Sequence, residues 1–180
     1  MDIRTLDADD LDLICQHREA MFRDAGQRDD VLTLMTGNFR EWVKPRLLDG
    51  SYFGYVIQDA AVPVAGIGLM LIDWPPHPAH PMQDKRGYVL NVFVEPDYRN
   101  RGLARELMHL AEAELVRRGV TFAILHATEK GKPLYRGLGW HGTTEMAKTL
   151  DVPPCREVGE DAMECAAQSV SSGACGGEPS

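Results

Sequence analysis

Several features that mark large protein classes are missing from this sequence. No apolar run approaches the roughly 18 residues that a helix needs to cross a bilayer. Basic residues are in deficit, because 19 Lys and Arg stand against 27 Asp and Glu and leave a net charge of −8. Binding to nucleic acid or to an anionic membrane requires surplus Lys and Arg, so we expect neither partner. The negative charge instead favours cationic amines.

Cysteine is also scarce, and its spacing does not suit a metal site. The four cysteines are Cys15, Cys155, Cys165 and Cys175. They form no CxxC pair, and His77 and His80 have no further ligand placed nearby, so we expect no metal. The N-terminal residues MDIRTLDADD have no apolar core like that of a signal peptide. This favours a cytoplasmic protein, in which cysteines stay reduced.

The 180 residues predict one globular domain over 1–150 and a flexible tail over 151–180. The tail contains no aromatic residue and is rich in Gly and Ser. Within the domain, apolar residues at three- and four-residue steps indicate helices, and β-branched or aromatic runs indicate strands. The predicted helices span 5–26, 30–48, 101–118 and 133–138, and the predicted strands span 51–58, 62–73, 88–94, 120–127 and 143–150. Four prolines within 74–87 predict a loop there.

The segment that carries the most chemical information is VEPDYRNRGLA, residues 94–104. It joins the end of a buried strand to the start of a helix, where unpaired N–H groups and a partial positive charge can hold a phosphate. Arg99, Arg101 and Arg105 crowd this helix N-terminus, although the helix dipole disfavours cations there. An anionic ligand would explain them, and a solvated basic turn is the alternative.

Residues 99–104, RNRGLA, resemble the R/Q-x-x-G-x-G/A loop of the GNAT superfamily of N-acetyltransferases. LNVFVEPDYRNRGLARELM resembles the central strand, loop and long helix of that family. LHATEKGKPLYRGLGW, residues 125–140, resembles its next strand, short helix and terminal motif, with Trp140 replacing the usual Phe. The resemblance covers about residues 1–150. It implies an α/β (α+β) fold with a mixed, mostly antiparallel central sheet, splayed middle strands and flanking helices.

The resemblance also implies an activity and a set of site residues. The activity is acetyl transfer from acetyl-CoA to a primary amine of a small molecule or peptide, by direct attack in a ternary complex. Tyr135 matches the family's tyrosine and is the expected general acid for the CoA thiolate. The residues implied for the pantetheine arm are Val92, Phe93 and Val94. Those implied for the pyrophosphate are Arg99, Asn100, Arg101, Gly102, Leu103 and Ala104. Dimers are common in the family, and nothing in the sequence excludes a homodimer.

The general base is where the resemblance fails. Many family members carry a Glu on the central strand at about the position of Leu90. Asn91 either holds a water that relays the proton or satisfies backbone groups of the splayed region. His126 in the neighbouring strand is a further candidate, or a hydrogen-bonded core residue. Two other functions therefore stay open: a non-catalytic acyl-CoA-binding or sensing module, and an interaction protein that uses the tail and the proline-rich loop.

Overall fold

The computed structural model describes residues 1–78 and 80–149. It divides the chain into one unit over Met1–His141 and a second over Gly142–Ser180. Every helix and strand of the described residues lies in the first unit. The prediction of a strand over 143–150 is wrong for residues 143–149. These residues are exposed, and no described strand pairs with them. The tail predicted over 151–180 lies outside the described residues.

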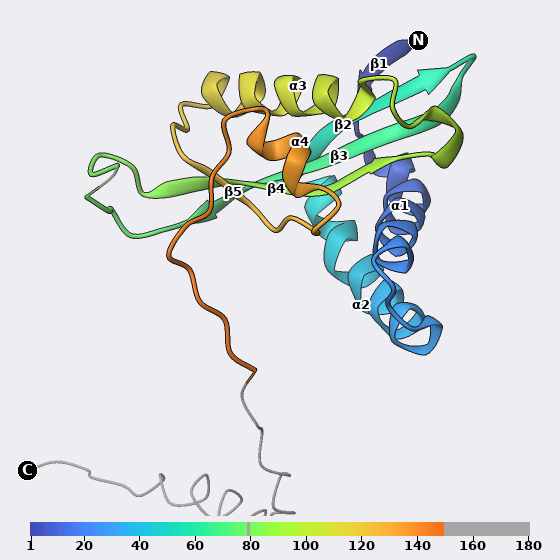
Figure 1. The fold of residues 1–180 in the computed structure, drawn as a ribbon, viewed down its shortest axis with the longest axis horizontal. Coiled ribbons are helices and arrows are strands. Elements are labelled where there is room, and N and C mark those ends of the chain that lie inside the picture. Colours follow the sequence, from blue (N-terminus) through green and yellow to red (C-terminus); the bar gives the residue numbers. More distant parts are fainter. Residues whose placement is uncertain (79, 150–180) are drawn as a thin grey trace, which may run out of the picture. The chain divides into compact units, whose positions relative to one another are not determined.

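Five strands form one sheet in the order β1-β2-β3-β4-β5 (Figure 1). Their bounds are β1 (Asp2–Thr5), β2 (Tyr52–Asp59), β3 (Val62–Asp73), β4 (Lys85–Val94) and β5 (Ala123–Leu125). The first three pairings are antiparallel, and β4 pairs with β5 in parallel. The mixed, mostly antiparallel sheet is thereby confirmed.

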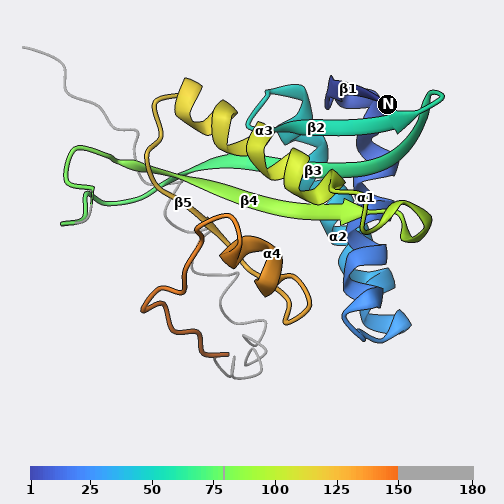
Figure 2. The same ribbon diagram turned by 45° about the horizontal axis from the view of Figure 1, so that its top comes forward.

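Helices cover both faces of the sheet. The helical elements are η1 (Ala8–Asp10), α1 (Leu11–Asp24), α2 (Asp29–Leu48), η2 (Pro96–Tyr98), α3 (Leu103–Arg117) and α4 (Lys132–Arg136). The pair α1 and α2 lies on one face, and α3 and α4 lie on the other (Figure 2). Within residues 1–78 and 80–149, none of the helices combines the length and apolar composition that crossing a membrane requires.

Several element boundaries differ from the sequence predictions. The strand predicted over 120–127 is shorter, because only Ala123–Leu125 form β5, and these residues are half-buried. The first helix begins at Leu11 rather than near residue 5, because Asp2–Thr5 pair with β2 and Asp7 caps the short helix η1. β4 begins at Lys85, inside the predicted loop, because its ladder with β3 extends to the pair Asp73 and Lys85. The β3–β4 hairpin is therefore longer than the prolines suggested.

The larger of two apolar clusters lies between the sheet and α3. The predicted stripe of α3 is confirmed, since Leu103, Leu107, Ala111 and Leu115 are all buried there. They pack against strand residues such as Ile67 of β3, which is 2% exposed. This packing fixes the position of the α3 N-terminus relative to β4.

Leu107→Ala tests how far the fold depends on this contact. The side chain is 0% exposed, so truncation leaves a cavity and lowers the free energy of unfolding by about 2–5 kcal/mol. Val116→Ala is the matched control on the same helix, because Val116 is 70% exposed and loses little on truncation. Urea denaturation of both variants measures the difference. Equal losses would contradict the assigned core.

Candidate functional site

The two central strands pair over only three residues before they separate. Gly87, Tyr88 and Val89 of β4 pair with Ala123, Ile124 and Leu125 of β5. β5 then ends, whereas β4 continues to Val94. The stretch 90–94 therefore has a strand neighbour only on its β3 side, within the described part of the chain. The expected splaying of the middle strands is present here.

A β-bulge lies in β4 at this point. Gly68 pairs with Leu90 and Gly66 pairs with Phe93, so Asn91 and Val92 together face the single residue Ile67. Asn91 has the left-handed backbone conformation, with φ of 54°. Asparagine tolerates this conformation better than most residues other than glycine.

The extra residue reverses the direction of the β4 amides. Before the bulge, the N–H of Gly87 donates to the carbonyl of Phe122, on the β5 side. After it, the N–H of Glu95 donates to Val64 O, on the β3 side. Both residues have odd numbers, and an uninterrupted strand would direct their amides the same way. The even-numbered Val92 and Val94 therefore direct their backbone groups to the side that β5 has left.

The loop before α3 presents a row of free backbone donors. Asn100 and Gly102 have positive φ values of 61° and 84°, and Gly102 is the N-cap of α3. Among the described residues, no acceptor takes a hydrogen bond from the amides of residues 100–105, and the first helical bond is from Glu106 N to Gly102 O. A Cβ on Gly102 would have no atom of residues 1–78 or 80–149 within 4 Å, so this surface is open to the described part of the chain. Such a row of N–H groups at a helix N-terminus suits a phosphate.

The arginines of the loop are placed differently from one another. Arg99 forms an ion pair with Asp24 of α1 and donates to Val94 O. Arg101 donates to the carbonyl of Asp97, and its guanidinium lies over the ring of Tyr98. Arg105 forms no ion pair with a described residue. Backbone amides, with Arg105 beside them, therefore supply most of the free positive potential.

Tyr135 lies on the same face of the sheet as α3. Its half-buried ring packs against the cluster beneath α3 and meets Trp140 edge-on, with the ring centroids 6.5 Å apart. Burial raises the pKa of the Tyr135 phenol, so the hydroxyl stays protonated at neutral pH. No described residue accepts from this hydroxyl or donates to it. Its proton is therefore available to a ligand.

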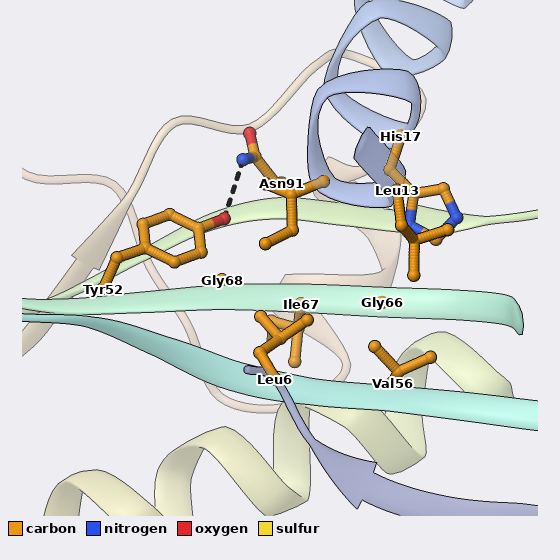
Figure 3. A pocket seen from close by; sticks show the side chains of 10 residues that line it. Leu6, Leu13, His17, Tyr52, Val56, Gly66, Ile67, Gly68 and Asn91 are labelled. Atoms are coloured by element: carbon orange, nitrogen blue, oxygen red, sulfur yellow. Dashed lines mark hydrogen bonds between the residues drawn. The ribbon is translucent and has the colours of Figure 1, made fainter. Parts of the chain in front are cut away.

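On the opposite face, Asn91 belongs to a network with α1 and β2. Its Nδ2 donates to the Tyr52 hydroxyl at 2.9 Å (Figure 3), and its Oδ1 accepts from Arg18 Nη1 at 2.7 Å. Gly68 makes room for the tyrosine, because a Cβ there would lie 2.0 Å from the Tyr52 hydroxyl oxygen. Both ends of the Asn91 amide thus have protein partners. The catalytic role expected for Asn91 stays a prediction.

His17 lines the small cavity beside this network (Figure 3). It is 5% exposed, its ring lies 4.8 Å from that of Phe93, and a Cβ on Gly66 would lie 2.9 Å from its Nδ1. Its Nε2 has no hydrogen-bond partner among the residues that the structure describes. Burial in this apolar site lowers the pKa of His17 to about 4, and nearby Asp10 opposes the shift only in part.

The other candidate residues are distributed over several places. Tyr88 Oη and His126 Nδ1 lie 2.9 Å apart and connect β4 to the chain after β5, and His126 is exposed rather than in the core. Leu90 packs against the apolar cluster of α1 and α2. His77 and His80 stack on each other in the β3–β4 loop. Among the described residues, no three His, Cys, Asp or Glu side chains group as a metal site would require.

Arg18, Tyr52 and His17 were missed in the sequence because they come from distant segments. The sequence feature that points to them is the pair Gly66 and Gly68. These glycines lie two positions apart, so one face of β3 lacks two side chains there. Glycines in a strand indicate close packing but do not identify the residues that fill the space.

Comparisons with known proteins agree with this arrangement. Residues 11–140 match the acetyltransferase (GNAT) family. The crystal structure of a GCN5-related N-acetyltransferase from Ralstonia eutropha is 57% identical, with a TM-score of 0.81 over 83% of this chain and 97% of that one. A predicted acetyltransferase from Clostridium acetobutylicum, solved with acetyl-CoA, shares the fold at 22% identity and a TM-score of 0.72, over 83% and 95%. No curated protein sequence matches the chain.

The buried His17 predicts a specific loss of stability in acid. In the unfolded chain a histidine titrates near pH 6.5, whereas His17 in the folded protein titrates near 4. Between these values the unfolded state binds more protons, so the free energy of unfolding falls as the pH falls, by about 3 kcal/mol in total. Urea denaturation at pH 7 and pH 4 measures this loss.

His17→Gln should flatten this pH dependence, even if it lowers stability at pH 7. His109→Gln is the control, because the His109 side chain is 61% exposed. It should keep the wild-type dependence. An unchanged slope in His17→Gln would contradict the assignment.

Proposed function

The chain belongs to the acetyltransferase (GNAT) family, and from this premise we propose that it transfers an acetyl group from acetyl-CoA to a primary amine. The amine attacks directly within a ternary complex. The observation that carries the proposal is that the chain presents two neighbouring backbone segments with free hydrogen-bonding groups. One is the row of amides over residues 100–105, and the other is the edge of β4 over 90–94.

The loop is the proposed pyrophosphate site. Residues 99–104 wrap the N-terminus of α3, and the free amides from Asn100 onward would donate to phosphate oxygens. Because Arg99 and Arg101 already have partners in the chain, the backbone contributes most of this binding. The edge formed by Val92, Phe93 and Val94 is the proposed site of the pantetheine arm, whose amides would pair with it as a strand does.

The same edge positions the reaction. The Val92 N–H, directed to the side without a strand, would stabilise the oxyanion that develops on the thioester carbonyl. The amine nitrogen forms a bond to the carbonyl carbon, the carbon–sulfur bond breaks, and the thiolate takes the proton of Tyr135. The attacking nitrogen must also lose a proton to a base. The Glu that many family members carry is absent here, because Leu90 occupies its position.

Gly102→Val tests the pyrophosphate site. Gly102 has a φ of 84°, so a β-branched residue strains the loop and displaces its amides. We expect acetyl-CoA affinity to fall at least tenfold in calorimetric titration. Gly119→Val is the control, because Gly119 has a φ of 79° at the other end of α3 and an added Cβ would likewise meet no described atom within 4 Å. It should cost similar stability and leave the affinity intact. No binding of acetyl-CoA to the wild type at millimolar concentration would overturn the proposed function.

Tyr135→Phe tests the general acid. Loss of the free hydroxyl should lower kcat about 100-fold and leave the Kd for acetyl-CoA within twofold, since the ring and its packing remain. Tyr55→Phe is the control on the same face, where the hydroxyl lies 3.4 Å from Glu114. Release of free thiol measures the rate. A wild type that binds acetyl-CoA and releases no thiol with any amine would favour the non-catalytic binding module.

A further inference from the structure

Arg18 is a cation without a counter-ion beside the bulge of β4. No described carboxylate lies within ion-pair distance of its guanidinium. Nη1 donates to Asn91, Nε is buried without a partner, and Nη2 donates to no described residue. A guanidinium has five N–H donors, so most of them are unused.

Two aromatic rings pack against the guanidinium of Arg18, which is half-buried. Its guanidinium carbon lies 5.0 Å from the ring centroid of Phe22 and 4.4 Å from that of Phe39. Burial lowers the pKa of Arg18, which means that the charge is poorly hydrated where it lies. A poorly hydrated guanidinium with a fixed plane binds a carboxylate strongly and with defined geometry.

Acidic residues are present on α1, but they pair with arginines other than Arg18. Asp12 pairs with Arg40, and Glu19 pairs with Arg23 and accepts from Thr36. Asp24 pairs with Arg99. Every carboxylate of α1 is therefore taken by a different arginine, and Arg18 alone among the arginines of this helix is left for a ligand.

The position of Arg18 relates it to the acceptor of the proposed reaction. The proposed pyrophosphate loop and Tyr135 lie on the α3 side of the sheet, which leaves the α1 and α2 side for the amine. Arg18 lies on that side and contacts Asn91, the residue next to the Val92 amide proposed to hold the oxyanion. We propose that Arg18 binds the carboxylate of the acceptor, and that the acceptor is an α-amino acid acetylated on its amino group.

This inference rests on the proposed function and narrows its substrate class. It departs from the preference for a cationic amine that the net charge of −8 suggested. An unpaired guanidinium near the reacting centre repels a polyamine or an aminoglycoside, whatever the charge of the distant surface. The short path from Arg18 through Asn91 to the bulge fits a molecule whose carboxylate and amine are close together.

The experiment compares the twenty standard L-amino acids with their carboxamides as acceptors of acetyl-CoA, scored by thiol release. The amide keeps the amine and the side chain and removes only the negative charge. For the best acid, we expect wild-type kcat/KM to exceed that for its amide at least tenfold, with most of the difference in KM. In Arg18→Met the ratio should fall to about one. Arg18→Lys should recover part of it, because the charge returns without the planar fork.

Arg23→Met is the matched control on α1, because Arg23 is exposed and paired with Glu19 and Asp29. It should keep the wild-type ratio. The Kd for acetyl-CoA should be unchanged in all three variants, and thermal unfolding checks that they fold. Binding gives a readout that is independent of turnover. The N-acetylated form of the best acid should bind the CoA-saturated wild type more tightly than the N-acetylated carboxamide does. The two should bind Arg18→Met equally.

Three results would overturn the assignment of Arg18. In the first, the wild type has equal kcat/KM for the acid and its carboxamide. In the second, Arg18→Met loses activity toward both substrates to the same extent. In the third, only amines without a carboxylate, such as spermidine or a peptide lysine, are acetylated. The second result would mean that Arg18 only holds Asn91 in place. In each of these cases the proposed acetyl transfer itself survives. Failure of acetyl-CoA to bind the wild type would instead overturn the proposed function, and the assignment of Arg18 with it.

Discussion

The extra residue in β4 is the constraint on which the site depends. An uninterrupted strand would have directed the Val92 amide toward β3 and would have paired it there. With Asn91 and Val92 together opposite Ile67, the strand changes the direction of its amides and of its side chains at once. Leu90 and Phe93 both contact residues of the α1 and α2 side, although they are three positions apart and an uninterrupted strand would place them on opposite faces. Val92 and Val94 pack toward α3. The bulge therefore decides which groups each half of the site contains.

The side chain of Asn91 explains how the bulge is held. A left-handed residue in the middle of a sheet is strained unless its surroundings determine it. Here Tyr52 and Arg18 hold the two ends of the amide, and the tyrosine reaches it because Gly68 has no side chain. Asp would accept from Arg18 but could not donate to Tyr52 when ionised, and Leu could do neither. The network thus connects α1 and β2 to the geometry of β4.

Much of the α3 side could be predicted from local sequence, and little of the α1 side could. The loop over 99–104, the stripe of α3 and the order of the elements are contiguous features, so spacing and capping residues reveal them. Arg18, Tyr52 and Asn91 lie 34 and 39 residues apart along the chain, and their contacts follow from the register of β2, β3 and β4. Periodicity places a residue on a face, but it does not tell which partner that residue meets. The missing strand over 143–149 has the same cause, because β-branched residues form a strand only beside another strand.

The two sides of the sheet also differ in how they present charge. On the α3 side the positive potential comes from backbone amides at a helix end, and two of the loop arginines are occupied by the chain itself. Such a surface binds phosphate without needing a net positive protein, so a charge of −8 is compatible with an anionic co-substrate. On the α1 side the Arg18 guanidinium lies near two phenyl rings, and Asn91 is its one hydrogen-bond acceptor among the described residues. Net charge describes the outer surface and its long-range field, whereas these local donors determine what can bind inside. The acidic composition is therefore no argument against anionic groups on both ligands.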